Sequence, residues 1–169
     1  KADPINAPFN VWLDELSGHL AKDFQRAETL IARICQTARG AFAGEQAERF
    51  VRLEVSNLLE RAPMPEVVED LLKGPLRHSM QVIYLSRGVA SDEWKQIIRA
   101  AQMLIDSMQA VEAEADMQRV YQTIPKVIPL LTKQLVSIAD AAEMDDWIGR
   151  IEKLHMQILL GSKVELRTA

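Results

Sequence analysis

The most suggestive pair of chemically active side chains is Glu152 and His155, a carboxylate and an imidazole three residues apart. Residues at this spacing share one face of a helix, and Glu-x-x-His supplies metal ligands in di-iron four-helix bundles. Such a site needs a second Glu-x-x-His pair, but neither His19 nor His78 has a glutamate three residues before it. We therefore interpret His155, four residues after Ile151 on an apolar stripe, as a partly buried histidine bonded to a backbone group.

The other reactive side chains have structural explanations. Asp140, Glu143 and the pair Asp145-Asp146 are typical of a helix start, where carboxylates complement the helix dipole, and they lack the glycine and final glutamate of a calcium loop. Cys35 lies on an apolar stripe, which predicts a buried, inert thiol. No phosphate-binding glycine loop, nucleophile elbow or His-Glu-x-x-His motif occurs. We expect no catalytic residue, no bound metal and no cofactor, so the chain is not expected to be an enzyme.

A ligand pocket between helices is the alternative chemical interpretation. Polar groups on otherwise apolar helix faces anchor small ligands in such cavities. Tyr84, Tyr121 and His155 are the candidates for this role.

The spacing of apolar residues predicts helices throughout. From Phe9 to Ala38 they recur every three or four residues, as in a long amphipathic helix, and Gly40 is a plausible end. A second helix is predicted from about Gly44 to Pro63. Similar stripes predict further helices over 65–72, 75–87, 92–111, 120–138 and 144–159, with either a kink near Thr123 or a fresh start at Pro125.

Gly74 and Pro75 are predicted to form a corner between two helices. Proline disfavours a helical conformation at the residue before it, and glycine can adopt backbone angles closed to other residues. The flanking residues Leu71, Leu72, Leu76 and Met80 are expected to be buried.

These elements predict an all-α fold, a single bundle of about six to seven helices joined by short loops. Residues 1–8 are expected to be a disordered or extended lead-in, 9–161 the bundle, and 162–169 a frayed tail. No sustained apolar-polar alternation or Asn-Gly or Asp-Gly turn suggests a sheet.

The composition bears on the possible partners and the cellular setting of the protein. The chain has 169 residues and a formal net charge of −4, which argues against a nucleic-acid surface. A single cysteine precludes an internal disulfide and favours a reducing, cytoplasmic setting, while no apolar run is long enough to cross a bilayer. The chain begins with Lys, which suggests a piece of a longer protein.

The segment Met64-Pro65-Glu66-Val67-Val68-Glu69-Asp70-Leu71-Leu72-Lys73-Gly74-Pro75 resembles a large bacterial family of unknown function, some of whose members are catalogued as thymidine phosphorylases. The likeness continues through Ile124-Pro125-Lys126-Val127-Ile128-Pro129-Leu130-Leu131 and ends at 147–159, with the pair Leu154-His155. It departs at Leu76, where a tryptophan is common. The resemblance implies a C-terminal portion of a long, cytoplasmic, mostly helical protein, with no catalytic residues to carry over.

Amphipathic helices without catalytic chemistry favour a protein-interaction or scaffolding module of a larger bacterial regulatory protein. The partner would be another protein or the rest of the parent chain, with neither nucleic acid nor membrane involved, and the oligomeric state is left open. The alternative is a small-ligand sensing domain with a cavity between helices.

Overall fold

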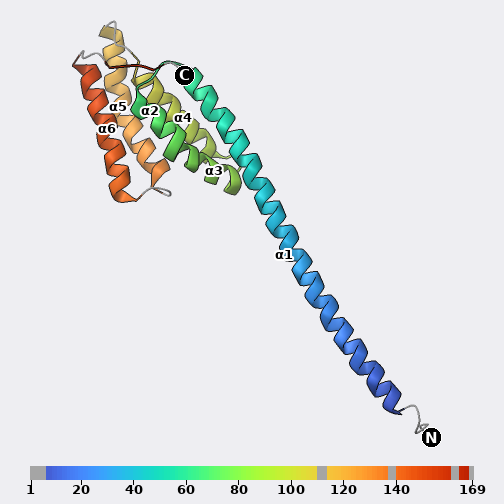
Figure 1. The fold of residues 1–169 in the computed structure, drawn as a ribbon. Helices are drawn as coiled ribbons and strands as arrows, with labels where there is room; N and C mark the ends of the chain where they lie inside the picture. Colours follow the sequence, from blue (N-terminus) through green and yellow to red (C-terminus); the bar gives the residue numbers. More distant parts are fainter. Residues whose placement is uncertain (1–6, 110–113, 137–139, 161–163, 168–169) are drawn as a thin grey trace. The chain divides into compact units, whose positions relative to one another are not determined.

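The computed structural model describes residues 7–109, 114–136, 140–160 and 164–167 (Figure 1). Apart from one isolated antiparallel bridge, the regular structure of these residues is helical, which confirms the predicted all-α class. Contacts between Cα atoms divide the chain into two units, Lys1–Gly44 and Glu45–Ala169, whereas the sequence predicted one bundle over 9–161.

The described residues of the first unit form the first part of helix α1, which runs from Ala7 to Glu60. Gly40 and Gly44 were predicted to separate two helices, and this prediction is wrong. Both glycines lie inside α1, where a glycine costs only about 1 kcal/mol relative to alanine. The described side chains of 9–43 are exposed, so this part of α1 has no core of its own and does not belong to the predicted bundle.

The second unit is the helical bundle. It contains the last turns of α1, then α2 (Glu66–Leu71), a π-helical turn η1 (Leu72–Leu76), α3 (Arg77–Ser86), α4 (Asp92–Ser107), α5 (Glu114–Leu135) and α6 (Ala141–Leu159). Helix α4 packs against α5, and α5 packs against α6 (Figure 1). The core takes side chains from every helix, among them Val51, Val68, Leu76, Ile97, Leu104, Leu131 and Ile151.

The predicted corner at Gly74-Pro75 is absent. The backbone stays helical from α2 through η1 into α3, with φ near −65° at both ends of η1, and Gly74 has no positive φ. The wider π turn tolerates a proline that would otherwise press on the preceding turn. The burial prediction is nevertheless confirmed, since Leu71, Leu72, Leu76 and Met80 are each fully buried.

Local chemistry explains the other helix ends. Helix α3 is followed by Gly88 with φ +79, whose N–H donates to the carbonyls of Ile83 and Tyr84. The Ser91 hydroxyl oxygen then caps α4 by accepting from the Trp94 N–H at 3.2 Å. Helix α5 continues through Pro125 and Pro129, so no fresh helix begins at Pro125.

Part of the predicted frayed tail is fixed to the bundle. Met64 and Arg167 exchange two backbone hydrogen bonds, of 3.0 and 2.8 Å, and Val164 packs against the core. The Arg167 guanidinium also lies 2.9 Å from the Glu66 carboxylate. Residues 162, 163, 168 and 169, like 1–6 of the predicted lead-in, lie outside the described residues, while Ala7 and Pro8 already belong to α1.

Candidate functional site

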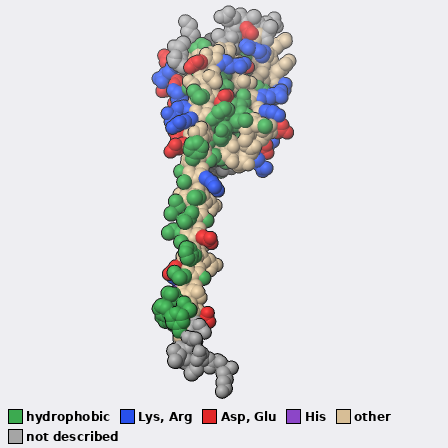
Figure 2. All heavy atoms as spheres, turned by 90° about the vertical axis from the view of Figure 1, so that its right-hand side faces the viewer, with side chains coloured by type: hydrophobic (Ala, Val, Ile, Leu, Met, Phe, Trp, Pro, Cys, Tyr) green, Lys and Arg blue, Asp and Glu red, His purple; other side chains and the backbone are tan. Residues whose placement is uncertain are grey.

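The largest unexplained feature of the described residues is an apolar stripe on the first unit. It consists of Phe9, Leu13, Leu16, Leu20, Phe24, Ala27, Ile31, Ile34, Ala38 and Phe42, and we call it the α1 stripe. Its large side chains are 41% to 70% exposed, with Phe24 the most exposed. Figure 2 shows hydrophobic side chains following one another along this helix. Exposed apolar patches of this extent mark interaction surfaces.

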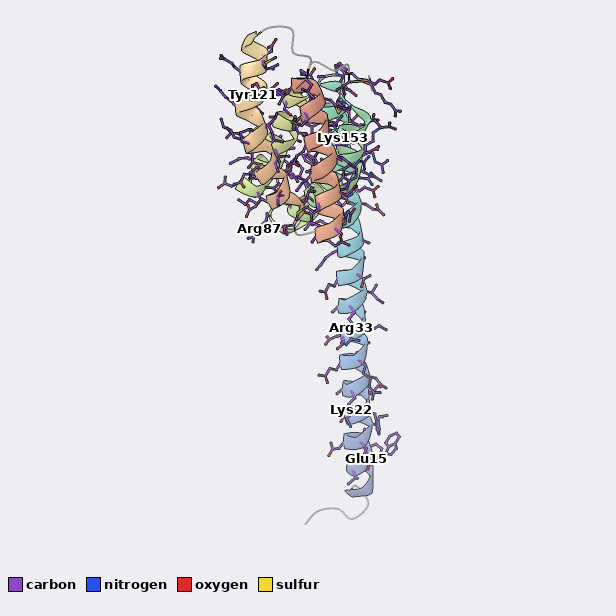
Figure 3. All side chains as sticks on the ribbon, turned by 90° about the vertical axis from the view of Figure 1, so that its left-hand side faces the viewer. Glu15, Lys22, Arg33, Arg87, Tyr121 and Lys153 are labelled. Carbon is purple, nitrogen blue, oxygen red and sulfur yellow. The ribbon has the colours of Figure 1, made fainter. Side chains whose placement is uncertain are left out.

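The stripe is one face of an amphipathic helix. Glu15, Lys22 and Arg33, labelled along the helix in Figure 3, are separated from it by roughly half a turn at 100° per residue. The first aromatic side chains already contact one another, since the Phe9 and Trp12 rings stack with centroids 6.4 Å apart. Such a helix can bury its apolar face against a second helix or a groove, and the arrangement supplies binding rather than bond-breaking chemistry.

Cys35 lies beside this stripe and is exposed, so the prediction of a buried thiol is wrong. Its apolar neighbours Ile31 and Ile34 are themselves 60% and 59% exposed. The sequence pattern correctly predicted that these residues share a face, but it could not show that the face is uncovered.

His155 is the buried titratable residue that the sequence singled out, and it is only 2% exposed. Its partner is the side chain of Ser107 on α4, and not the predicted backbone group. The Ser107 hydroxyl donates to the Leu104 carbonyl at 2.7 Å, so its oxygen accepts from the His155 Nε2–H at 2.9 Å. These bonds place a proton on Nε2, so the neutral ring is the tautomer with Nδ1 unprotonated.

The remaining nitrogen of His155 has no partner among the described residues. Nδ1 is buried and unprotonated in this tautomer, so its lone pair is unsatisfied. Burial lowers the pKa of His155 from 6.5 to about 4, which keeps the ring neutral at pH 7. Glu152, which shares the Glu-x-x-His spacing with His155, is exposed, and no group of potential metal ligands gathers within the described part of the chain.

The structure does not bring the three predicted ligand contacts together. Tyr84 belongs to an aromatic cluster, with ring centroids 5.1 Å from Phe50 and 6.3 Å from Trp94. Tyr121 on α5 is 57% exposed (Figure 3). Only His155 is deeply buried.

A cavity of about 280 Å³ instead lies between α4 and α5, and its residues were not predicted as a site. The wall includes Ser107, whose other neighbour is His155. Three cations line the cavity together with one acid: Arg99, Arg119, Lys126 and Asp106. The sequence spreads these residues over two helices, and no local spacing links them.

Two further predictions concern the acidic residues at the start of α6 and the possibility of a membrane-spanning helix. The Asp140 carboxylate caps α6 by accepting from the Glu143 N–H at 2.8 Å, as expected for a helix-start acid. Within the described ranges, none of the helices has the length and apolar character that a membrane crossing requires.

Comparison with known protein families gives a match over much of the chain. The family model described as protein of unknown function (DUF1631), third domain, matches residues 37–152, which is more than half of the chain. The chain belongs to this family. No curated protein and no solved structure matches it. The matched residues cover most of the bundle but only the last part of the α1 stripe, from Ala38 onward.

Proposed function

We propose that this chain is a protein-interaction module without catalytic activity, and that the α1 stripe is its contact surface. The observation that carries this proposal is the exposure of the large stripe side chains from Phe9 to Phe42. An isolated helix gains stability mainly by burying such a face, so a free stripe of this length favours a partner. The family match is to a domain of unknown function and leaves the role open.

The partner is a protein surface or another part of the parent chain, in a cytoplasmic bacterial setting. A nucleic acid is disfavoured by the net charge of −4. In sequence, the helix with the exposed apolar face continues into a bundle that has its own hydrophobic core. The stripe can therefore bind a partner without removing side chains from that core, which fits a scaffolding role.

Matched variants test this role. Leu20→Glu combined with Ile31→Glu places two charges in the middle of the stripe, whereas Gln25→Glu combined with Gln36→Glu places them on the opposite side of the helix. Each 169-residue chain is immobilised and exposed to a cell extract of its source, and the retained proteins are identified by mass spectrometry. The unmodified chain and the Gln variant should retain the same proteins, and the Leu20/Ile31 variant should lose them. Identical retention by all three chains would contradict the proposal.

Ligand sensing is a second candidate function, favoured by the cavity between α4 and α5. Its lining of Arg99, Arg119 and Lys126 favours a small anion, and Ser107 would couple occupancy to His155. Calorimetric titration with inorganic phosphate tests this candidate. Binding that is lost in Arg119→Ala would support it, and the absence of heat at millimolar phosphate would remove it.

A further inference from the structure

The α1 stripe is nearly symmetric about its own middle, between Gln25 and Arg26. Reading outward from that point, apolar residues occur at equal distances in both directions. Within the stripe the matched pairs are Phe24 with Ala27, Leu20 with Ile31, Leu13 with Ala38, and Phe9 with Phe42. Leu16 is matched by Cys35, which lies beside the stripe, and Ile34 is the stripe residue without an apolar match, since it pairs with Ser17. A helix that meets a second copy of itself running in the opposite direction would place the two members of each pair side by side.

The charges have the opposite symmetry. From Phe9 to Phe24 the charged residues are Asp14, Glu15 and Asp23 against one Lys22, a net charge of −2. From Gln25 to Phe42 they are Arg26, Arg33 and Arg39 against one Glu28, a net charge of +2. In an antiparallel pair each acidic half faces a basic half, whereas in a parallel pair like charges face each other. Charge therefore favours the same arrangement as the apolar pattern.

We propose that the α1 stripe binds a second copy of this chain as an antiparallel helix pair centred between Gln25 and Arg26. This proposal rests on the proposed function, because it names the partner of the same surface. The paired length from Phe9 to Phe42 is about 50 Å at a rise of ~1.5 Å per residue, or nearly five heptads, which is enough for a stable two-helix seam.

The mass of the purified chain in solution is the first test. Analytical ultracentrifugation at micromolar to hundreds of micromolar concentration should show a species of twice the 19.0 kDa chain mass that dissociates on dilution. The Leu20→Glu/Ile31→Glu variant should remain a single chain over that range, at least tenfold weaker in association. A control with uncharged exchanges on the opposite side of the helix, Gln25→Ala/Gln36→Ala, leaves the charge of both halves unchanged and should associate like the unmodified chain.

Cys35, the chain's one cysteine, reports the direction of pairing. In the antiparallel pair the two Cys35 thiols lie about 30 Å apart along the axis, while each faces position 16 of the other copy. A short bismaleimide should therefore fail to cross-link the unmodified chain. It should also fail with Leu16→Cys/Cys35→Ser, but it should cross-link Leu16→Cys, which carries both thiols. In a parallel pair each residue faces its own copy. The unmodified chain and Leu16→Cys/Cys35→Ser, which each have a single thiol, would then both be cross-linked.

The outcomes separate this inference from the proposed function. A single-chain mass at all concentrations, or cross-linking through Cys35 alone, overturns the antiparallel pair. If the mass is that of one chain but the stripe still retains proteins from the extract in a Leu20- and Ile31-dependent way, the interaction module stands with a different partner. If the chain neither forms a pair nor retains proteins from the extract, both proposals fail.

Discussion

Helix α4 and the first thirty-odd residues of α1 have the same kind of apolar spacing, but their apolar side chains differ in exposure to solvent. In α4 the apolar residues Ile97, Leu104 and Ile105 are fully buried by neighbouring helices. On α1 the equally regular residues Leu20 and Ile31 are 50% and 60% exposed. The comparison teaches that apolar periodicity predicts that a face will be covered, but whether by the same chain or by another is decided by elements far away in sequence.

The largest expected contrast is between a core leucine and a stripe leucine. Leu104→Ala should lower the free energy of unfolding of the bundle by about 2–5 kcal/mol, because it opens a cavity in a fully buried site. Leu20→Ala should change the same quantity by less than about 0.5 kcal/mol. Urea unfolding followed by the fluorescence of Trp94 and Trp147, with Trp12 replaced by Phe, measures both. Equal losses would show that the stripe belongs to the core after all.

An intermediate effect should appear on acidification, and only in the bundle. The unfolded chain protonates His155 near pH 6.5, whereas the folded chain does so only near pH 4. Between these values the unfolded state binds more protons, so stability falls as the pH is lowered, with a slope of up to about 1.4 kcal/mol per pH unit. His155→Gln should remove this contribution to the slope in urea titrations between pH 7 and 4.

Ser107→Ala is the control for that titration. It should cost about 1–3 kcal/mol at pH 7, because the buried Nε2–H of His155 loses its acceptor, but it should retain a pH dependence. A slope that is identical in the unmodified chain and in His155→Gln would show that His155 does not titrate in this window.

The smallest expected effects concern two kinds of glycine. Gly40→Ala should strengthen α1 by up to about 1 kcal/mol, because this glycine is helical and a Cβ there meets nothing within 4 Å. Gly88→Ala should destabilise the bundle by about 1 kcal/mol, because its φ of +79 disfavours a side chain. Circular dichroism and thermal melting measure the two changes, and the same sign for both would contradict this distinction.

The sequence predicted most of the fold because most of it is local. Helix type, the Ser91 and Asp140 caps and the burial of four apolar side chains follow from spacing and end chemistry within a few residues. Those four side chains are Leu71, Leu72, Leu76 and Met80. The exposure of the stripe could not be predicted, because its own spacing does not show whether another element covers it. The Ser107–His155 bond was missed for the same reason, since it joins residues 48 positions apart.

The effects of the glycines and prolines could not be predicted from the sequence, because they depend on the surrounding structure. Gly40 costs too little to end a helix that continues on both sides. Pro125 and Pro129 lie on the exposed side of α5, where water can bond the carbonyls that lose a donor.

The π turn at Leu72–Leu76 changes the register of buried side chains along the helix, which affects how related sequences align with this chain. At 100° per residue, the buried side chains before it (Val68, Leu71 and Leu72) and those after it (Leu76, Ser79 and Met80) would point in directions that differ by roughly one residue's rotation. The turn absorbs that difference, so η1 acts as a one-residue insertion that leaves both faces in the core. A relative one residue shorter here, and without the proline, would hold the same six side chains in place on an ordinary α-helix. An alignment of such a relative with this chain should open a gap inside a helix and not in a loop.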